Sequence, residues 1–208
     1  MFERIQVLIT ALLLAAIVIW LQFYQLETQS LLDQFDFDAA VLWAEPWRIF
    51  SAHLFHLDTQ HAISNAIGVL LPTVFFLRHF TVRTWLNAFI IIAASTSIII
   101  WLWGAPSRFV GLSGVIHGLF VTGLLLDWGS HQYHRSQWLL PTVLALLVVK
   151  VVLEIAGLMQ SSLLLNAGAD FGYIHAAGIL GGLIAWRLHR RYLASIAKQS
   201  KPAQRSPH

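Results

Sequence analysis

Residues 5–24 read IQVLITALLLAAIVIWLQFY, a run of twenty residues without a charged side chain. An α-helix rises about 1.5 Å per residue, so this run is long enough to cross the roughly 30 Å hydrocarbon core of a bilayer. The run is too long for the apolar core of a signal peptide, and no small-residue cleavage site follows it. We therefore predict that it is a retained membrane-spanning helix.

The same apolar pattern recurs along the rest of the chain. Hydrophobic residues make up 57% of the 208 residues. Charged residues make up only 11%, against roughly 25% in soluble domains. This composition excludes both a soluble globular domain and a disordered chain. Further membrane spans are predicted at residues 61–80, 84–103, 113–128, 138–157 and 172–186.

These spans predict an all-α membrane protein with a bundle of six transmembrane helices. The bundle forms one domain over residues 1–186 and includes a long outer loop, residues 25–60. That loop mixes acidic and aromatic residues, so we expect it to lie in the membrane interface or to pack on the bundle. Residues 187–208 are predicted to form a basic cytoplasmic tail.

The basic residues orient this bundle. With the N-terminus in the cytoplasm, ten of the thirteen Lys and Arg residues fall on the cytoplasmic side, as the positive-inside rule requires. They are Arg4, Arg78, Arg83, Arg135, Arg187, Arg190, Arg191, Lys198, Lys201 and Arg205. Both termini are therefore expected in the cytoplasm. The net charge of +3 reflects this topology, and we predict no binding of nucleic acid.

The residue types also limit the chemistry. The absence of cysteine excludes disulfides, iron–sulfur clusters, thiolate zinc sites and a cysteine nucleophile. Ten histidines raise the possibility of a metalloprotease or a haem protein. However, the H-E-x-x-H motif is missing, and the histidines around residues 53–61 have no carboxylate at ligand spacing. We predict no metal and no other cofactor.

Polar side chains gather at the outer ends of the even-numbered spans. The second span begins with His61 and Asn65, the fourth begins with Ser113, and the sixth carries His175 close to its start. Polar groups are costly inside a membrane, so their convergence at one depth points to a functional site. The alternative is a set of ordinary hydrogen bonds between helices.

The fourth span suggests what the site does. Its sixteen residues make a helix about 24 Å long, shorter than the bilayer core, so Ser113 is expected below the outer surface. The N–H groups and the dipole of a helix start favour developing negative charge there. Gly178 and Gly182 would let the sixth helix approach the fourth closely. His175 can then act as general base for Ser113.

The surroundings of this pair are also predicted. His61 and Asn65 are one helical turn apart and would donate hydrogen bonds to an oxyanion. The even-numbered helices carry no acidic residue at matching depth, which predicts a Ser–His dyad without a third member. Lys150 and Glu154 are one turn apart in the fifth span and are predicted to pair with each other.

Taken together, these motifs resemble the rhomboid family of intramembrane serine proteases, and the resemblance covers nearly the whole chain. The family has a Trp-Arg pair in the first loop and an H-x₄-H-x₃-N motif that runs into the second span. It also has a G-x-S-G motif at the start of the fourth span and an H-x-x-G motif in the sixth. These motifs correspond to Trp47-Arg48, His56-x₄-His61-x₃-Asn65, Gly111-Leu112-Ser113-Gly114 and His175-Ala176-Ala177-Gly178.

The resemblance implies a role for each of these residues. It implies that Ser113 is the nucleophile and His175 the base, with His61 and Asn65 as the oxyanion donors. It implies structural roles for three further residues, Trp47, Arg48 and His56.

The run GLSGVIHG at residues 111–118 resembles the rhombosortase branch of that family. Four residues after the serine, where many rhomboids have an aromatic residue, this chain has His117. His117 is expected either to pack against His175 or to compete with it as the base. The branch implies membrane-anchored substrates with a Gly-Gly motif, a C-terminal hydrophobic helix and a basic end. It also implies the bacterial inner membrane, with the active site opening to the periplasm.

Two alternatives come from other classes of protein. One is an inactive rhomboid-like protein that binds transmembrane helices, which the intact Ser113 and His175 argue against. The other is a transporter, which internal repeats and an intramembrane charge network would favour, but Lys150 and Glu154 are the only such charges. The sequence does not specify the oligomeric state.

Overall fold

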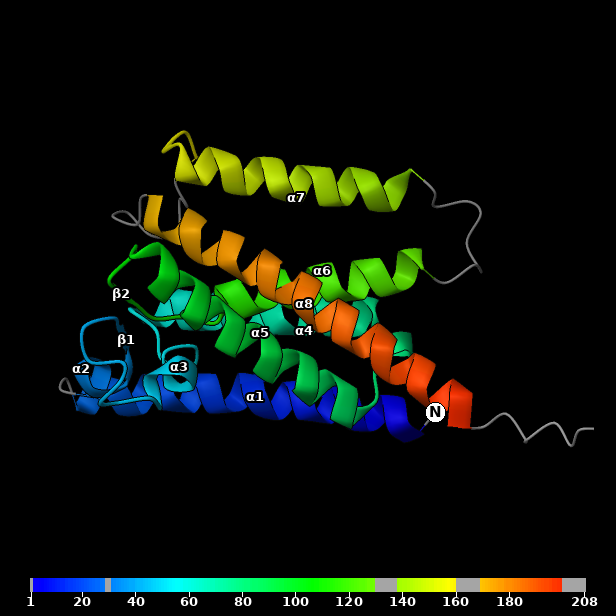
Figure 1. Ribbon diagram of the computed structural model, residues 1–208. Coiled ribbons are helices and arrows are strands. Elements are labelled where there is room, and N and C mark those ends of the chain that lie inside the picture. The colour runs from blue at the N-terminus through cyan, green and yellow to red at the C-terminus, as the bar shows by residue number, and fades with distance from the viewer. Residues whose placement is uncertain (1, 29–30, 130–137, 160–168, 200–208) are drawn as a thin grey trace, which may run out of the picture.

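The structure is a computed structural model that describes residues 2–28, 31–129, 138–159 and 169–199. Six long helices run lengthwise beside one another (Figure 1). They are α1 (Phe2–Glu27), α4 (Thr59–Phe75), α5 (Val82–Trp103), α6 (Ser113–Trp128), α7 (Leu139–Ile155) and α8 (Ala169–Gln199). Each predicted span overlaps one of these helices. Within the described residues, three segments are long and apolar enough to cross a membrane, namely Phe2–Glu27, Val82–Trp103 and Asp170–Ile196.

Two of the helices differ from the predicted spans in length. α4 ends at Phe75 and is followed by the 3₁₀ turn η1 (Leu77–His79), so the predicted span 61–80 is not one continuous helix. α8 continues to Gln199, well past residue 186, so the first part of the predicted basic tail prolongs the last helix. The rest of that tail, residues 200–208, lies outside the described residues, as does Arg135.

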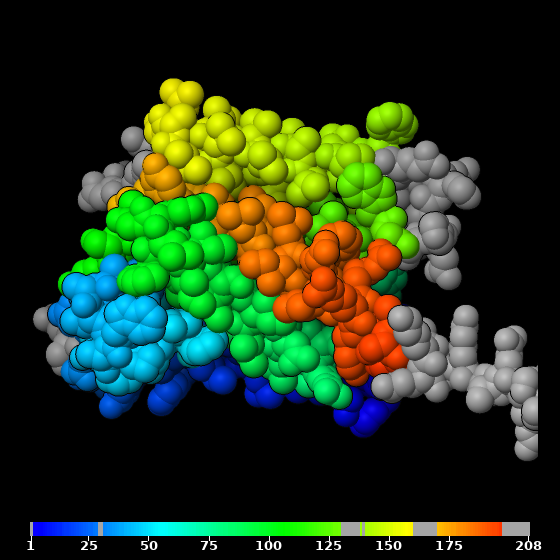
Figure 2. All heavy atoms as spheres, viewed as in Figure 1, coloured from blue at the N-terminus to red at the C-terminus, as the bar shows by residue number. Residues whose placement is uncertain are grey.

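The outer loop folds into a compact cap at one end of the bundle, seen beside the end of α5 in Figure 2. Its elements are α2 (Leu31–Phe35), β1 (Phe37–Asp38) and α3 (Arg48–Ser51), and β1 pairs with β2 (Arg108–Phe109) in an antiparallel register. Phe37 lies opposite Phe109, and their rings stack with centroids 4.7 Å apart. α3 also packs against α5, which confirms the expectation that the loop packs on the bundle.

α6 lies at the centre of the bundle, packed against α4, α5 and α8. Its closest neighbour is α8, because glycines on both helices face each other. A Cβ atom on Gly178 would overlap the carbonyl group of Gly114, and one on Gly182 would overlap that of Gly118. The close approach predicted from the small-residue spacing is thus present, and any larger residue at these positions would push the two helices apart. α7 runs alongside α8 and also contacts α6 (Figure 1).

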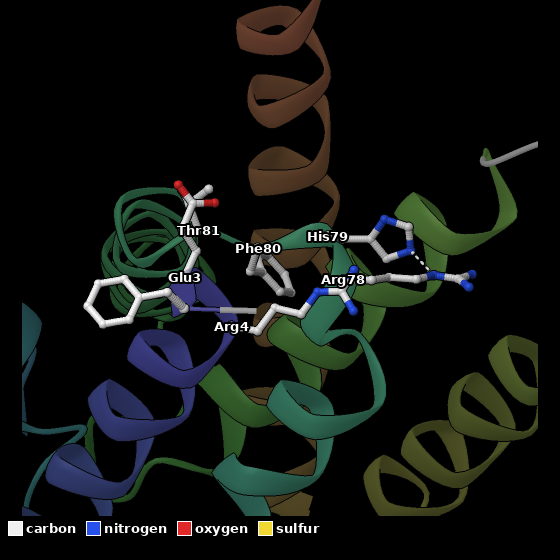
Figure 3. Close-up of a pocket in the computed structure, with 7 residues that line it drawn as sticks. Glu3, Arg4, Arg78, His79, Phe80 and Thr81 are labelled. Carbon is white, nitrogen blue, oxygen red and sulfur yellow. Dashed lines mark hydrogen bonds between the residues drawn. The ribbon is translucent and has the colours of Figure 1, made fainter.

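The end of the bundle away from the cap carries a pocket of about 460 Å³ (Figure 3). It is lined by Phe2, Glu3, Arg4, Arg78, His79, Phe80 and Thr81. The η1 turn that forms one wall is joined to the last turn of α6, because Arg78 and His79 both contact the Asp127 carboxylate. These contacts fix the C-terminal end of α6, opposite to the end that begins with Ser113.

Candidate active site

The loop that leads to Ser113 is fixed by backbone hydrogen bonds. The Gly111 N–H donates to the Ala52 carbonyl oxygen at 2.8 Å, which joins the loop to α3 and the cap. The Leu112 N–H donates to Nε2 of His56 at 3.4 Å. Ser113 is the first residue of α6, as predicted, and is only partly buried. Its hydroxyl group therefore lies at a helix start that is fixed by Ala52 and by His56.

The structure brings Ser113 and His175 together. Oγ of Ser113 lies 3.0 Å from Nε2 of His175, which comes from the first turns of α8. The His175 side chain is buried, with 7% of the residue exposed. This distance follows from the glycine contacts between α6 and α8, because only helices this close can place the two side chains within hydrogen-bond reach.

The prediction that no carboxylate lies beside His175 is wrong. Oε2 of Glu154, from α7, lies 2.7 Å from Nδ1 of His175. Oε1 of the same carboxylate lies 2.9 Å from Nζ of Lys150, so the predicted Lys150–Glu154 pair is confirmed but is not isolated. Glu154 lies in the fifth span, whereas the predicted dyad rested on the residues of the even-numbered helices. The available signal was a charged pair in an otherwise apolar span, which is costly unless it has partners.

His117 lies flat against His175. The two ring centroids are 4.0 Å apart and the rings are nearly parallel, at 17°. Nδ1 of His117 lies 2.7 Å from the Ser113 carbonyl oxygen, and Nε2 lies 3.0 Å from Nζ of Lys150. Both ring nitrogens are therefore engaged with groups other than the Ser113 hydroxyl. Of the two placements predicted for His117, the structure has the one in which it packs against His175.

His61 and Asn65 lie beside the loop that precedes Ser113. Asp58 caps α4 by accepting the His61 N–H at 2.7 Å, which starts the helix that carries both residues. A Cβ on Gly111, whose φ is +121°, would lie 2.9 Å from Nε2 of His61 and 3.8 Å from Nδ2 of Asn65. Glycine is therefore required here both for its backbone conformation and for space.

The amide group of Asn65 is an unsatisfied donor. Its Nδ2 is buried and has no hydrogen-bond partner among the described residues, and neither has Nδ1 of His61. Neither residue makes a direct hydrogen bond to the Ser113 side chain in the part of the chain that is described. Buried donors without partners are rare in folded proteins, so the unpaired amide group of Asn65 calls for an explanation.

His56 contacts both the loop before Ser113 and the ring of His61. It is fully buried, its ring contacts that of His61 edge-on at 4.8 Å, and its carbonyl oxygen accepts from Nε2 of Gln25 in α1 at 2.9 Å. Burial, followed by the nearby His61 ring, lowers the pKa of His56 to about 3. The ring therefore stays neutral and can accept the Leu112 N–H, which holds the residue before the serine.

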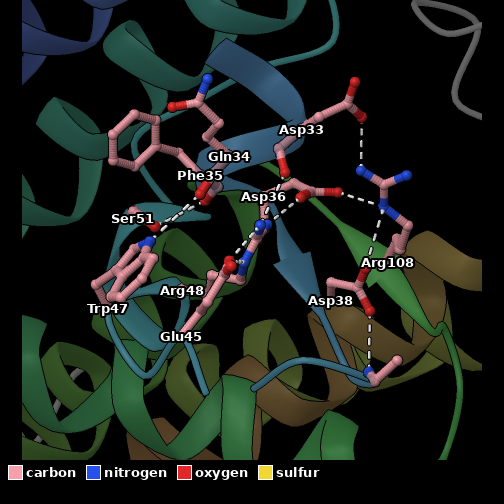
Figure 4. Close-up of polar contacts among 11 residues, drawn as sticks. Asp33, Gln34, Phe35, Asp36, Asp38, Glu45, Trp47, Arg48, Ser51 and Arg108 are labelled. Atoms are coloured by element: carbon pink, nitrogen blue, oxygen red, sulfur yellow. Dashed lines mark hydrogen bonds and ion pairs between the residues drawn. The ribbon is translucent and has the colours of Figure 1, made fainter. Parts of the chain in front are cut away.

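Arg48 and Trp47 hold the cap together (Figure 4). The Arg48 guanidinium is buried, binds the Asp36 carboxylate at 2.6 Å and donates to the carbonyl oxygens of Asp36 and Asp33. Nε1 of Trp47 donates to the Gln34 carbonyl oxygen at 3.3 Å. Both residues therefore act within the cap and stabilise it.

Arg108 extends the same network to β2, just before the serine loop. It binds Asp36 at 2.6 Å and Asp33 at 2.7 Å, and these hydrogen bonds raise the pKa of the Arg108 guanidinium. No role for Arg108 could be predicted from the sequence, because its partners lie more than seventy residues earlier. Among the residues that the structure describes, no group of three or more His, Cys, Asp or Glu is placed to hold a metal ion.

The family model of the rhomboid domain matches residues 44–191, which is more than two thirds of the chain. The matched range includes every site residue named above from Trp47 to His175, and both Lys150 and Glu154. No curated protein matches the chain.

Proposed function

The chain belongs to the rhomboid family, and on that premise we propose that it is an intramembrane serine endopeptidase. As a member of this family it is a helical, multi-pass integral membrane protein. The proposal takes all six long helices as membrane-spanning. α4, α6 and α7 have 17, 16 and 17 residues, which makes them about 24–26 Å long and sufficient only for a slightly thinned core.

The observation that carries the proposal is the 3.0 Å contact between Oγ of Ser113 and Nε2 of His175. In the first step, the Ser113 oxygen attacks the scissile carbonyl carbon while Nε2 of His175 accepts the hydroxyl proton. The imidazolium then returns that proton to the leaving amine, which leaves an acyl-enzyme. Water, deprotonated by the same nitrogen, hydrolyses the ester.

The oxyanion of the tetrahedral intermediate needs donors on the α4 side of the serine. We assign this role to Asn65 and His61, together with the Ser113 N–H at the start of α6. Support comes from the partnerless Nδ2 of Asn65 and from the closeness of both side chains to Gly111. Each such donor contributes about 10²- to 10³-fold in rate.

The substrates belong to the same proposal. The run 111–118 favours the rhombosortase branch, whose substrates are membrane-anchored proteins with a C-terminal hydrophobic helix, and the bacterial inner membrane as location. A helical segment hides its carbonyl groups in hydrogen bonds, so the cleaved segment must unwind first. Glycine weakens a helix by about 1 kcal/mol relative to alanine, which favours cleavage near Gly-Gly. Replacing those glycines by leucine in a substrate is expected to block its processing.

The test compares cells that carry the wild-type protein with cells that carry Ser113→Ala. We expect the C-terminal helices of some membrane-anchored proteins to be removed only in the wild type, and a fluorophosphonate to label the wild type at Ser113. Chelators are expected to leave cleavage unchanged. The Ser113→Ala protein must be present and folded in the membrane, so that loss of cleavage reflects the missing hydroxyl group and not a missing protein. Continued cleavage by that variant would refute the proposal.

A further inference from the structure

The geometry around Nδ1 of His175 assigns a role to two charged residues of α7 that a dyad does not need. We infer that Glu154 is a positioning residue, which fixes His175 in the tautomer that can accept the Ser113 proton, and that Lys150 holds Glu154 in place. This inference rests on the proposed function, because it concerns how the same serine is activated.

The tautomer follows from the chemistry of the carboxylate. Glu154 binds the Lys150 ammonium at 2.9 Å and is therefore ionised, so its oxygens can only accept hydrogen bonds. Oε2 lies 2.7 Å from Nδ1 of His175, so this nitrogen must carry the hydrogen. A neutral imidazole has one N–H, which leaves the lone pair of Nε2 free to accept from the Ser113 hydroxyl at 3.0 Å.

Lys150 decides which oxygen of Glu154 is available. Its ammonium donates to Oε1 of Glu154 and, at 3.0 Å, to Nε2 of His117. Oε2 is thereby left for His175. Because an ammonium cannot accept, Nε2 of His117 must be unprotonated, and its Nδ1–H donates to the Ser113 carbonyl oxygen at 2.7 Å. Each nitrogen and oxygen in this chain of contacts thus has one consistent role.

The arrangement also holds the ring of His175 in space. His117 from α6 stacks on one face at 4.0 Å, and Phe171 lies tilted against the ring at 6.2 Å. Glu154 contacts the Nδ1 edge from α7, and Ser113 contacts the Nε2 edge. Groups from three helices therefore fix both the position and the rotation of the ring.

The charge of Glu154 matters in the transition state as well as in the resting protein. When Nε2 accepts the serine proton, the imidazolium carries a positive charge beside Lys150, whose Nζ lies 3.5 Å from Nδ1. The Glu154 carboxylate lies closer, with Oε2 at 2.7 Å from the same nitrogen, and offsets that charge. It keeps its own charge throughout, because the proton stays on the imidazole. A buried, paired carboxylate in an apolar helix is costly, which is why it points to a role in the reaction.

Glu154→Gln gives a sharp test because Lys150 dictates how the amide lies. The ammonium can only donate, so the glutamine oxygen must face Lys150 and the NH₂ group must face Nδ1 of His175. That NH₂ donates to Nδ1 and forces the hydrogen onto Nε2, where it blocks acceptance of the serine proton. In a serine-protease triad, replacement of the carboxylate by an amide lowers the rate on the order of 10⁴-fold.

The experiment uses the full chain in lipid nanodiscs and a fluorophosphonate as probe, so that no substrate need be known. The rate of labelling at Ser113 is measured for the wild type, Glu154→Gln, Glu154→Asp and the control Glu27→Gln, which removes an exposed carboxylate of α1. We expect the control to match the wild type and Glu154→Gln to be slower by on the order of 10⁴-fold. Glu154→Asp keeps an acceptor and should label faster than Glu154→Gln.

A second measurement separates positioning from packing. Nitrogen-15 spectra of histidine-labelled protein, with His175 assigned by its loss in His175→Ala, should show hydrogen on Nδ1 in the wild type and on Nε2 in Glu154→Gln. Wild-type labelling rates in Glu154→Gln, or an unchanged tautomer, would overturn the inference. So would a Glu154→Asp variant that is no faster than Glu154→Gln. Failure of the wild type to label would instead refute the proposed function.

Discussion

Replacing Gly178 by alanine tests whether the contact between α6 and α8 sets the distance between the serine and the histidine. A Cβ at this position would lie 2.6 Å from the carbonyl carbon of Gly114 and 2.8 Å from its Cα. Carbon atoms pack at about 3.5–4.0 Å, so the helices must separate by about 1 Å. Oγ of Ser113 and Nε2 of His175, now 3.0 Å apart, would then lie beyond hydrogen-bond distance.

The expected loss follows from that displacement. A misplacement of about 1 Å between reacting groups costs about 10²-fold in rate, which equals about 2.7 kcal/mol of transition-state stabilisation. The assay is the fluorophosphonate labelling rate at Ser113, read together with the melting temperature in detergent. We therefore expect Gly178→Ala to label about a hundredfold more slowly while it remains folded.

Gly181→Ala is the matched control for this prediction. It adds the same methyl group to α8, but its Cβ would face α5, at 3.2 Å from the Ile92 carbonyl oxygen. A shift of a few tenths of an ångström relieves that contact and leaves the α6–α8 distance unchanged. Wild-type labelling by Gly178→Ala would refute the reasoning. An equal loss in Gly181→Ala would show that any crowding of α8 is enough.

Three further predictions concern single side chains. Asn65→Ala is expected to lower the cleavage rate by about 10²- to 10³-fold with little loss of stability, because the buried Nδ2 has no partner to lose; unchanged cleavage would exclude the oxyanion role. His117→Tyr should retain measurable cleavage, since an aromatic ring can replace the stacking on His175, whereas His175→Ala should have none; the opposite pair of results would make His117 the base. Arg48→Met leaves the buried Asp36 carboxylate with only one of its two cationic partners, Arg108. We expect this variant to destabilise the cap by about 3–5 kcal/mol, measured as a lower melting temperature. An unchanged melting temperature would contradict the cap's dependence on this ion pair.

Much of the site could be predicted because its signals are local. The length and apolar character of each span determine where the helices lie, and α6 has the predicted bounds, Ser113 to Trp128. The glycines four residues apart in α8 predicted its close contact with α6, which in turn predicted that His175 reaches Ser113. These features depend on the helical repeat and on side-chain size, and both can be read from a few neighbouring residues.

The sequence by itself determined the helices, the serine at a helix start and the histidine that faces it. Only the tertiary structure decided the carboxylate partner of His175 and the network that joins Asp36 to Arg48 and Arg108. A charged pair one turn apart, such as Lys150 and Glu154, satisfies itself in any isolated helix, so its spacing gives no third partner. Which way Glu154 points depends on how α7 is rotated against α8, and that rotation is set by packing over whole helix faces.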